Sequence, residues 1–264
     1  METDLVEQFI HWSERDRNRS PHTIARYRAT LKQLADPGAA TREEVEAWWA
    51  SRYDAAPATR ENELACLRSF YRWAMRFDHR DDDPTRRLDA PTVPNKIPRP
   101  IAKSDLERII GPLTVDHLEI RRAVALGAYG GLRVAEVAAL DWSNVDIESR
   151  RIYIRGKGAK ERVNGLSAVL QDIIAPNTGG NVVTAGGGQY SAAVLQRKVN
   201  RFMERNGINQ TFHDLRKRGA TQAMAKVRNP QAVAQAFGWS SLQTVTHYAV
   251  VGDETLDEIA NAMV

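Results

Sequence analysis

Apolar residues recur every three or four positions between Leu5 and Ala74, which is the period of an amphipathic helix. Ser20 and Pro21 should begin a helix, because serine caps free N–H groups and proline suits the first helical position. Thr41 and Glu44 have the spacing of a capping box before a third helix. The pattern predicts four helices around one small core, with apolar positions at Leu5, Phe9 and Trp12; Ile24, Tyr27, Leu31 and Leu34; Val45, Trp48 and Trp49; and, from about Thr59, Leu64, Leu67, Tyr71, Trp73 and Ala74.

A segment rich in proline and acidic residues then interrupts the helical pattern. It runs from Asp78 to Pro100 and has prolines at positions 84, 91, 94, 98 and 100. Proline lacks a backbone N–H and fixes φ, so we expect an extended connection here. We therefore predict an N-terminal domain over residues 1–90, a linker over 91–100 and a second domain over 101–264.

Helical spacing resumes beyond the linker, with one interruption. Ser104 and Glu107 predict a second capping box, and helical periodicity continues to Gly130 and Gly131. Residues 151–155 and 161–163 are rich in β-branched and aromatic side chains and flank a glycine-containing segment, which predicts a β-hairpin. Residues 181–184 predict another short strand, and helices are expected over 191–206, 214–227, 230–237 and 242–249, with a short one near the C-terminus. The fold class is therefore mainly α, with a small β-hairpin or sheet in the second domain.

Composition excludes several classes of protein. Hydrophobic residues make up 42% of the chain and charged residues 27%, as in an ordinary globular protein. No apolar stretch approaches the roughly 18 residues of a membrane span, and the acidic N-terminus is unlike a signal peptide. Cys66, the single cysteine, excludes an intrachain disulfide and a cysteine-rich metal site. We expect a cytoplasmic location, in the nucleoid if the partner is DNA, and no metal, since the spacing of His11, His22, His79 and His117 is not that of metal ligands.

The net charge of +4 is small, but its distribution along the chain is uneven. Residues 1–100 hold 17 basic and 17 acidic residues, and residues 101–264 hold 20 and 16. Six basic residues and one acid lie between Arg15 and Lys32. Arginines also repeat every four residues in two places, which would form basic stripes on helices; such stripes follow DNA phosphates or are simply solvated helix faces. The candidate DNA-binding residues are Arg26, Arg28, Arg68, Arg72, Arg76, Arg197 and Arg201.

Two short motifs place cationic side chains where phosphate chemistry would need them. Arg133 follows a glycine pair at the expected start of a helix, where an incoming phosphate can meet it. Its spacing from Glu136 also fits an ordinary helical ion pair. Further along, His213 and Arg216 share one helix face. Neither motif alone decides between a catalytic and a structural role.

The order of all the motifs resembles the tyrosine recombinase (phage integrase) family. The chain has Gly-Leu-Arg-x-x-Glu at 131–136, a Gly-Lys-Gly-x-Lys-Glu-Arg hairpin at 156–162, His-x-x-Arg at 213–216 and Gly-Trp-Ser followed by Tyr248. Lys157 follows Arg133 by 24 residues, and Tyr248 follows Trp239 by 9, which fits the family. The resemblance covers the whole second domain, and the N-terminal four-helix domain is similar to the family's SAM-like core-binding domain.

The resemblance implies the role of each residue. Arg133 and Arg216 would each offer forked donors to the non-bridging oxygens of a DNA phosphate. Tyr248 would attack that phosphate and form a 3′-phosphotyrosyl link, with a free 5′ hydroxyl as the other product. Lys157 would protonate the leaving oxygen, with Lys160 as its competitor on the same hairpin.

The remaining site residues have supporting roles. His213 would accept the tyrosine proton or hold a non-bridging oxygen. Trp239 stands where many family members have histidine, and its indole N–H can donate to phosphate. Glu136 would orient the site, and His247 is expected on the surface. The reaction conserves phosphodiester energy, so we expect no cofactor, neither metal nor ATP.

These implications lead to a site-specific DNA recombinase, an integrase of a phage or mobile element. It would be a monomer in solution and a homotetramer on double-stranded DNA with inverted core repeats, exchanging strands through a Holliday junction. A Xer-type recombinase that resolves dimers has the same catalytic residues, so neighbouring genes would separate the two. The separate four-helix domain disfavours a type IB topoisomerase, and the intact residue set disfavours a non-catalytic DNA-binding regulator.

The end of the chain predicts an assembly contact. Leu256, Ile259, Ala260 and Met263 form an i, i+3, i+4, i+7 apolar stripe within residues 253–264. A stripe on so short a helix needs a partner surface. The family resemblance points to the neighbouring protomer, and packing within the same chain is the alternative.

Overall fold

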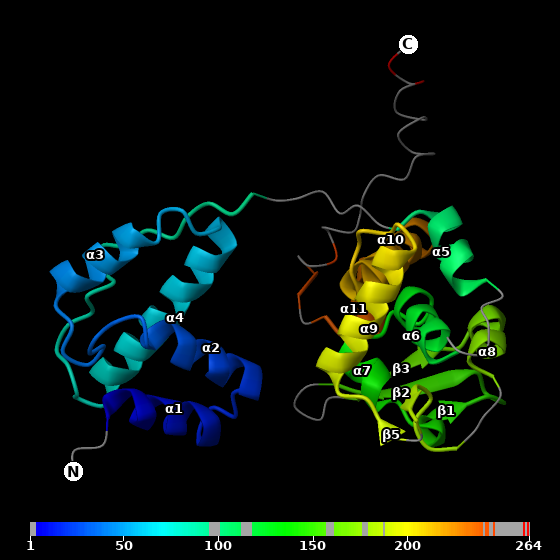
Figure 1. Cartoon of the computed structure of the whole chain (residues 1–264), viewed down its shortest axis with the longest axis horizontal. Helices are drawn as coiled ribbons and strands as arrows, with labels where there is room; N and C mark the ends of the chain where they lie inside the picture. The colour runs from blue at the N-terminus through cyan, green and yellow to red at the C-terminus, as the bar shows by residue number, and fades with distance from the viewer. Residues whose placement is uncertain are drawn as a thin grey trace. The chain divides into compact units, whose positions relative to one another are not determined.

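The computed structural model describes residues 4–94, 101–111, 118–156, 161–175, 179–186, 188–239, 241–242, 245, 261 and 263. The chain divides into two compact units, Met1–Asn95 and Lys96–Val264 (Figure 1). Lys157, Lys160, His117, His247 and Tyr248 lie outside the described residues, as do residues 253–264 apart from Asn261 and Met263. No helix in the described ranges is long and apolar enough to cross a membrane.

Over residues 4–94, the first unit contains four helices: α1 (Leu5–Arg15), α2 (Pro21–Leu31), α3 (Arg42–Ser51) and α4 (Pro57–Arg76). Each begins where local chemistry favours it. Ser20 caps α2, and Thr41 and Glu44 form a reciprocal capping box on α3, as predicted. The longest helix, α4, begins at Pro57, two residues before the predicted start, because proline is preorganised for the first helical position.

The core of the first unit is rich in aromatic residues. Phe9 of α1 lies against Tyr27 of α2 and against Phe70 and Trp73 of α4, with ring centroids 5.2 to 5.5 Å apart. Trp48 and Trp73 are buried as predicted, whereas Trp49 is half-buried and packs against the edge of the core. The guanidinium of Arg60 lies 4.3 Å from the centre of the Trp49 ring. Leu88 also packs into this core, so the unit continues past the end of α4.

The second unit is built around one buried helix, α6 (Leu118–Ala128), in which Ala123 to Ala128 are all buried. The helices that pack on α6 are α5 (Lys103–Ile110), α7 (Val134–Ala139), α8 (Ala168–Ile174), α9 (Ala192–Arg205) and α10 (Phe212–Val227) (Figure 1). A shorter helix, α11 (Pro230–Phe237), packs against α10. Gly219 allows α10 to pack closely on the C-terminal end of α6, since a Cβ there would lie 2.7 Å from the carbonyl oxygen of Ala128.

A three-stranded antiparallel sheet lies at one side of the second unit, in the order β1 (Val145–Asp146), β2 (Arg151–Arg155) and β3 (Glu161–Gly165). The predicted hairpin is confirmed, with Arg155 opposite Glu161 and Ile152 opposite Asn164. β3 extends two residues beyond the prediction, and β1 was not predicted because two residues carry no periodic signal. A second small sheet pairs β4 (Thr184–Ala185) with β5 (Gly188–Gln189).

Three local predictions need correction. Ser104 and Glu107 form no capping box, because α5 begins at Lys103 and Glu107 faces the ammonium of Lys103 at 3.7 Å. Residues 181–184 are not one strand: Asn181 forms an isolated bridge with Asp141, and β4 begins only at Thr184. The helix expected at 214 begins at Phe212, because Thr211 and Asp214 cap it.

Candidate active site

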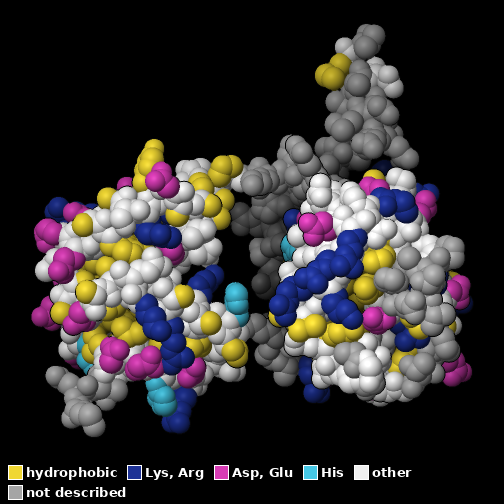
Figure 2. Space-filling view, viewed as in Figure 1, with side chains coloured by type: hydrophobic (Ala, Val, Ile, Leu, Met, Phe, Trp, Pro, Cys, Tyr) yellow, Lys and Arg dark blue, Asp and Glu magenta, His cyan; other side chains and the backbone are white. Residues whose placement is uncertain are grey.

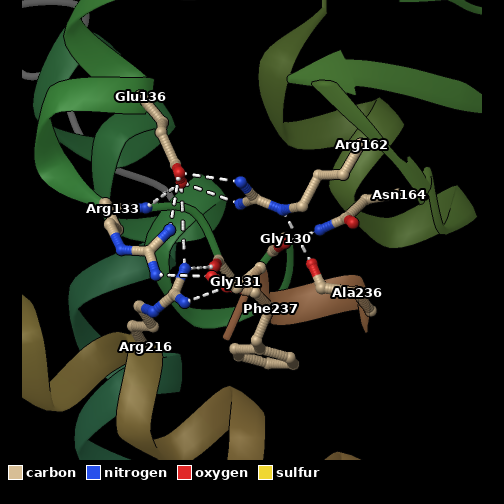
Figure 3. Close-up of polar contacts among 10 residues, drawn as sticks. Gly130, Gly131, Arg133, Glu136, Arg162, Asn164, Arg216, Ala236 and Phe237 are labelled. Atoms are coloured by element: carbon tan, nitrogen blue, oxygen red, sulfur yellow. Dashed lines mark hydrogen bonds and ion pairs between the residues drawn. The ribbon is translucent and has the colours of Figure 1, made fainter. Parts of the chain in front are cut away.

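Glu136, in the first turn of α7, lies at the centre of a cluster of arginines (Figure 3). Its side chain is only 5% exposed. Arg162 of β3 donates to both carboxylate oxygens, at 2.7 and 2.8 Å. Arg133 donates from its guanidinium at 2.9 Å and from its backbone N–H at 2.7 Å. Nη1 of Arg216 lies 3.8 Å from the same carboxylate. One negative charge therefore faces three positive charges, and the cluster keeps an excess of positive charge.

The C-terminal end of α11 holds the same three arginines. Three consecutive carbonyl oxygens there each accept a hydrogen bond from a different guanidinium: Ala236 from Arg162 at 2.9 Å, Phe237 from Arg216, and Gly238 from Arg133 at 3.0 Å (Figure 3). The last carbonyls of a helix have no partner within it and carry partial negative charge, so cations are favoured at this end. These contacts bring α11 together with α7, α10 and β3.

Arg216 of α10 is buried, with a side chain only 3% exposed. Its guanidinium donates to the carbonyl oxygens of Gly131 and Phe237. It also lies over the rings of Phe237 and Trp239, 5.1 and 5.5 Å from their centres. The two rings stack on each other with centroids 5.0 Å apart. Hydrogen bonds and aromatic rings thus fix the direction of this guanidinium.

Gly131 is required by this packing. Its φ is +66°, a conformation that favours glycine, and a Cβ there would lie 2.8 Å from ring carbons of Phe237. We expect Gly131→Ala to lower the free energy of unfolding by about 1–3 kcal/mol, because strain and overpacking act together. Urea unfolding measures this. The matched control is Gly165→Ala, where a Cβ meets nothing within 4 Å, and an equal loss in both variants would contradict the packing argument.

The exposed arginine of the cluster is Arg133, at the N-terminal end of α7. Its side chain is 43% exposed, in contrast to the buried side chains of Arg162 and Arg216. A guanidinium has five N–H donors in a fixed fork. Its contacts with Glu136 and Gly238 orient this fork while one side remains open to solvent. Arg133 can therefore receive an anion that approaches from outside.

His213 lies one turn before Arg216, at the start of α10. Desolvation and the nearby positive charges of Lys217, Arg216 and Arg133 lower its pKa, and the charge of Asp214 opposes this shift. The imidazole is therefore neutral at neutral pH, although part of the side chain remains open to solvent. A neutral imidazole can accept a proton or a hydrogen bond.

Burial alone would raise the pKa of Glu136, but the hydrogen bonds from Arg162 and Arg133 lower it from 4.5 to about 2. A carboxylate whose pKa is lower in the folded than in the unfolded protein stabilises the fold when the pH is above its unfolded-state pKa. This stabilisation is lost as the pH falls toward and through its folded-state pKa. We expect the wild-type protein to lose about 3 kcal/mol more than Glu136→Gln between pH 5 and pH 2. Chemical denaturation across this range tests it, and equal pH slopes for the two proteins would contradict it.

The structure brings together four of the residues singled out from the sequence: Arg133, Glu136, Arg216 and Trp239. The positive charges of Arg133 and Arg216 also lower the pKa of His213. Lys157 and Tyr248, which complete the predicted set, lie outside the described residues. The helical ion pair of Arg133 and Glu136, considered as the structural alternative, exists as well, but as one part of the larger cluster.

Arg162 and Asn164 have no role in the predicted site, although both side chains point inward from β3. Arg162 has a side chain 9% exposed, and Asn164 donates to the carbonyl oxygen of Gly130 at 2.9 Å. The register of the predicted hairpin could have identified these two residues as inward-facing. Arg162 pairs with Ile154 and Asn164 with Ile152, and both isoleucines are buried. Polar residues opposite buried isoleucines occupy the inner face, where they need polar partners.

The candidate DNA-binding residues have different environments. In the first unit, Arg28 is bidentate to Glu7, Arg68 donates to the carbonyl oxygen of Leu88, and Arg26 donates to Asn62. A groove of the first unit is lined by four arginines and several aromatic and hydroxyl residues, among them Arg17, Arg19, Arg72, Arg76, Tyr27 and Ser69. In the second unit, basic side chains gather over α9, where Arg197, Lys198, Arg201 and Arg205 line a groove (Figure 2).

Known proteins match this chain in both of its units. Residues 100–254 match the phage integrase family, and residues 6–77 match the N-terminal SAM-like domain of phage integrases. Tyrosine recombinase XerC of Rhodospirillum centenum is 30% identical over 96% of this chain and 84% of its own length.

Two solved structures have the same fold. The XerH site-specific recombinase bound to palindromic difH substrate has a TM-score of 0.74 and 18% identity, over 97% of this chain and 84% of that chain. The lambda integrase tetramer bound to a Holliday junction has a TM-score of 0.72 and 14% identity, over 90% of this chain and 76% of that chain. The mainly helical fold predicted from the sequence is thereby confirmed. The chain belongs to the phage integrase family and is a tyrosine-type site-specific DNA recombinase.

Proposed function

We propose that the arginine cluster binds the phosphate at which DNA is cut and rejoined. The observation that carries this proposal is the anchoring of Arg133 and Arg216 to one carboxylate and to consecutive carbonyl oxygens of α11. Two oriented forks match the two non-bridging oxygens of a phosphodiester, and their excess charge offsets the charge of a five-coordinate transition state. Arg133 is held with one side open before DNA arrives, whereas the buried Arg216 must turn a donor from its carbonyl partners toward the phosphate when DNA binds.

The covalent step then balances as a transesterification. The phenolic oxygen of Tyr248 bonds to phosphorus, and the bond from phosphorus to the 5′ oxygen breaks. The tyrosine proton passes to His213, whose lowered pKa keeps the imidazole neutral and able to accept it. Lys157 protonates the departing 5′ oxygen. Trp239 donates its indole N–H to the phosphate, and the reverse of these steps rejoins the strand.

The two domains have separate tasks in this proposal. Residues 1–90 bind core DNA, residues 91–100 link the domains, and residues 101–264 carry catalysis. The basic groove of Arg72 and Arg76 in the first unit and the basic face of α9 with Arg197 and Arg201 in the second are supported as phosphate-binding surfaces by their exposure. Arg26, Arg28 and Arg68 contribute less, because side chains or carbonyl oxygens of the first unit already hold them.

The proposed assembly on DNA is based on two of the structures compared above. The lambda integrase compared above is a tetramer on a Holliday junction, and the XerH complex holds a palindromic substrate. We propose that this chain is a monomer in solution and a homotetramer on two duplexes, each with inverted core repeats. Residues 253–264 would pack on the neighbouring protomer. Deleting them should spare binding to a single site and reduce cooperative occupancy of paired sites, as gel shifts would measure.

Covalent trapping tests the proposed chemistry. A binding sequence is first selected from random duplexes, and a nick beside the cleavage position then lets the cut fragment diffuse away. The wild-type protein should form a protein–DNA adduct that survives a denaturing gel. A protein that binds the selected DNA with high affinity and forms no adduct at any nick position would overturn the proposal.

The same substrate tests metal independence. Arg133, Arg216 and Lys157 supply the positive charge in the proposed mechanism, so the adduct should form at an undiminished rate in excess EDTA. Binding should weaken about 10³-fold or more between 50 and 200 mM salt, because phosphate contacts release counterions. Inhibition by EDTA that magnesium specifically reverses would contradict the mechanism.

We propose that the biological role is integration and excision of a phage or mobile element. A Xer-type role is the second candidate, favoured by the 30% identity to XerC. Deleting the gene in its host distinguishes the two roles. Loss of element excision with normal cell division would support the integrase, whereas filamentous cells with unresolved chromosome dimers would support the Xer-type role.

A further inference from the structure

We propose that Arg162 is a positioning residue of the recombination reaction, which holds Glu136 so that Arg133 and Arg216 face the DNA phosphate. This inference rests on the proposed function, because it assigns phosphate binding to those two arginines. Arg162 has no place among the residues that touch the phosphate. It acts through the carboxylate and through the end of α11 (Figure 3).

Arg162 makes the strongest contact with Glu136 in the cluster. Both carboxylate oxygens accept from its two terminal nitrogens, at 2.7 and 2.8 Å, and both side chains are nearly buried, at 9% and 5% exposed. This forked geometry is the strong form of an ion pair. The hairpin also has a surface pair, Arg155 with Glu161, whose side chains are 78% and 69% exposed. Of these two ion pairs, only that of Arg162 and Glu136 is shielded enough from solvent to hold its side chains in one orientation.

The charge of Glu136 would otherwise compete with the DNA. A buried carboxylate with only Arg133 and Arg216 as partners would draw the donors of both toward itself. Because Arg162 satisfies both carboxylate oxygens, Arg133 needs to give Glu136 only one guanidinium contact, at 2.9 Å, and Arg216 remains 3.8 Å away. Arg162 therefore leaves the 43% exposed side chain of Arg133 able to face a phosphate, and it holds the carboxylate at a fixed distance from Arg216.

Arg162 also joins separate parts of the second unit. Its Nε donates to Ala236, next to the carbonyl oxygens that hold Arg216 and Arg133. A Cβ on Gly238 would lie 3.2 Å from its side chain, so α11 ends directly against it. Asn164, two residues along β3, ties the strand to Gly130.

Single-turnover cleavage of the nicked substrate tests the role of Arg162. Arg162→Gln should cleave about 100-fold more slowly than the wild type, as expected for an ångström-scale displacement of the phosphate-binding groups. Its DNA affinity should change less than about 3-fold, because the summed contacts of DNA-binding surfaces elsewhere supply most of the binding. Arg155→Gln is the matched control: it removes the same charge from the exposed pair of this hairpin and should cleave at the wild-type rate.

A double-mutant cycle separates positioning from general damage to the fold. If Arg162 acts through Glu136, adding Arg162→Gln to Glu136→Gln should slow cleavage by much less than it slows the wild type. Should Arg162→Gln fail to fold, Arg162→Lys takes its place in the cycle, since it keeps the charge and loses the fork.

Two results would overturn the inference: cleavage by the Arg162 variant within about 3-fold of wild type, or an equal loss in the wild-type and Glu136→Gln backgrounds. Failure of the proposed function would look different, because the wild-type protein itself would then form no adduct.

Discussion

Tyr248→Phe should form no covalent complex with the nicked substrate, while its DNA affinity and thermal stability match those of the wild type. The change removes one oxygen atom, the proposed nucleophile, and leaves the rest of the side chain in place. We expect the cleavage rate to fall by at least about 10⁴-fold, because no other side chain of the proposed site can replace this nucleophile. Denaturing gels measure the adduct, and gel shifts measure the affinity.

A matched control for this variant is Tyr153→Phe, which removes a phenolic oxygen from the exposed face of β2 in the same unit. This control should form the adduct at the wild-type rate. An adduct in Tyr248→Phe of the same yield as in the wild type would assign the nucleophile to another residue.

Arg133→Lys should slow cleavage by roughly 10²–10³-fold with little loss of stability, because a lysine keeps the charge but cannot present a fork to two phosphate oxygens. The side chain is 43% exposed, so its replacement leaves no large cavity. Its contact with Gly238 would be lost, which adds misalignment of the α11 end to the lost donor. Single-turnover cleavage at saturating protein concentration isolates this effect from DNA binding.

Arg108→Lys provides the control, at a helical ion pair outside the arginine cluster. Arg108 pairs with Asp105 at 2.8 Å with the same i,i+3 spacing, also donates to the carbonyl oxygen of Asn206 at 2.6 Å, and has a side chain that is 49% exposed. Lysine there should leave cleavage within about 2-fold of wild type, since such pairs contribute little. If the two variants lose the same activity, Arg133 is only a structural ion pair.

Local sequence signals predicted the helices well wherever a cap or a turn residue defined the boundary. Ser20 and Thr41 begin their helices as predicted, and the helix at Pro230–Phe237 has the expected bounds. Ser104 and Glu107 carried the same signal and failed, because α5 begins at Lys103, two residues before the start that an N-cap at Ser104 implies. A capping-box pattern therefore indicates a nearby helix start without fixing its first residue.

The sequence indicated which residues belong to the candidate site, but not the contacts that hold them in place. Motif order pointed to Arg133, His213 and Arg216, but the role of Arg162 depends on β3 facing α7 and α11, a long-range contact. The three successive carbonyl oxygens of α11 are equally invisible in sequence, since backbone atoms leave no compositional trace. The hairpin register places Arg162 opposite the buried Ile154, and this pairing identifies it as an inward cation.

The most direct test of the central claim is the chemical identity of the covalent adduct. The trapped complex is digested with protease and nuclease, and tandem mass spectrometry locates the residue that carries the nucleotide. We expect one modified peptide, with Tyr248 joined to a 3′ phosphate and a free 5′ hydroxyl on the released strand. A nucleotide on any other residue, or a link to a 5′ phosphate, would contradict it.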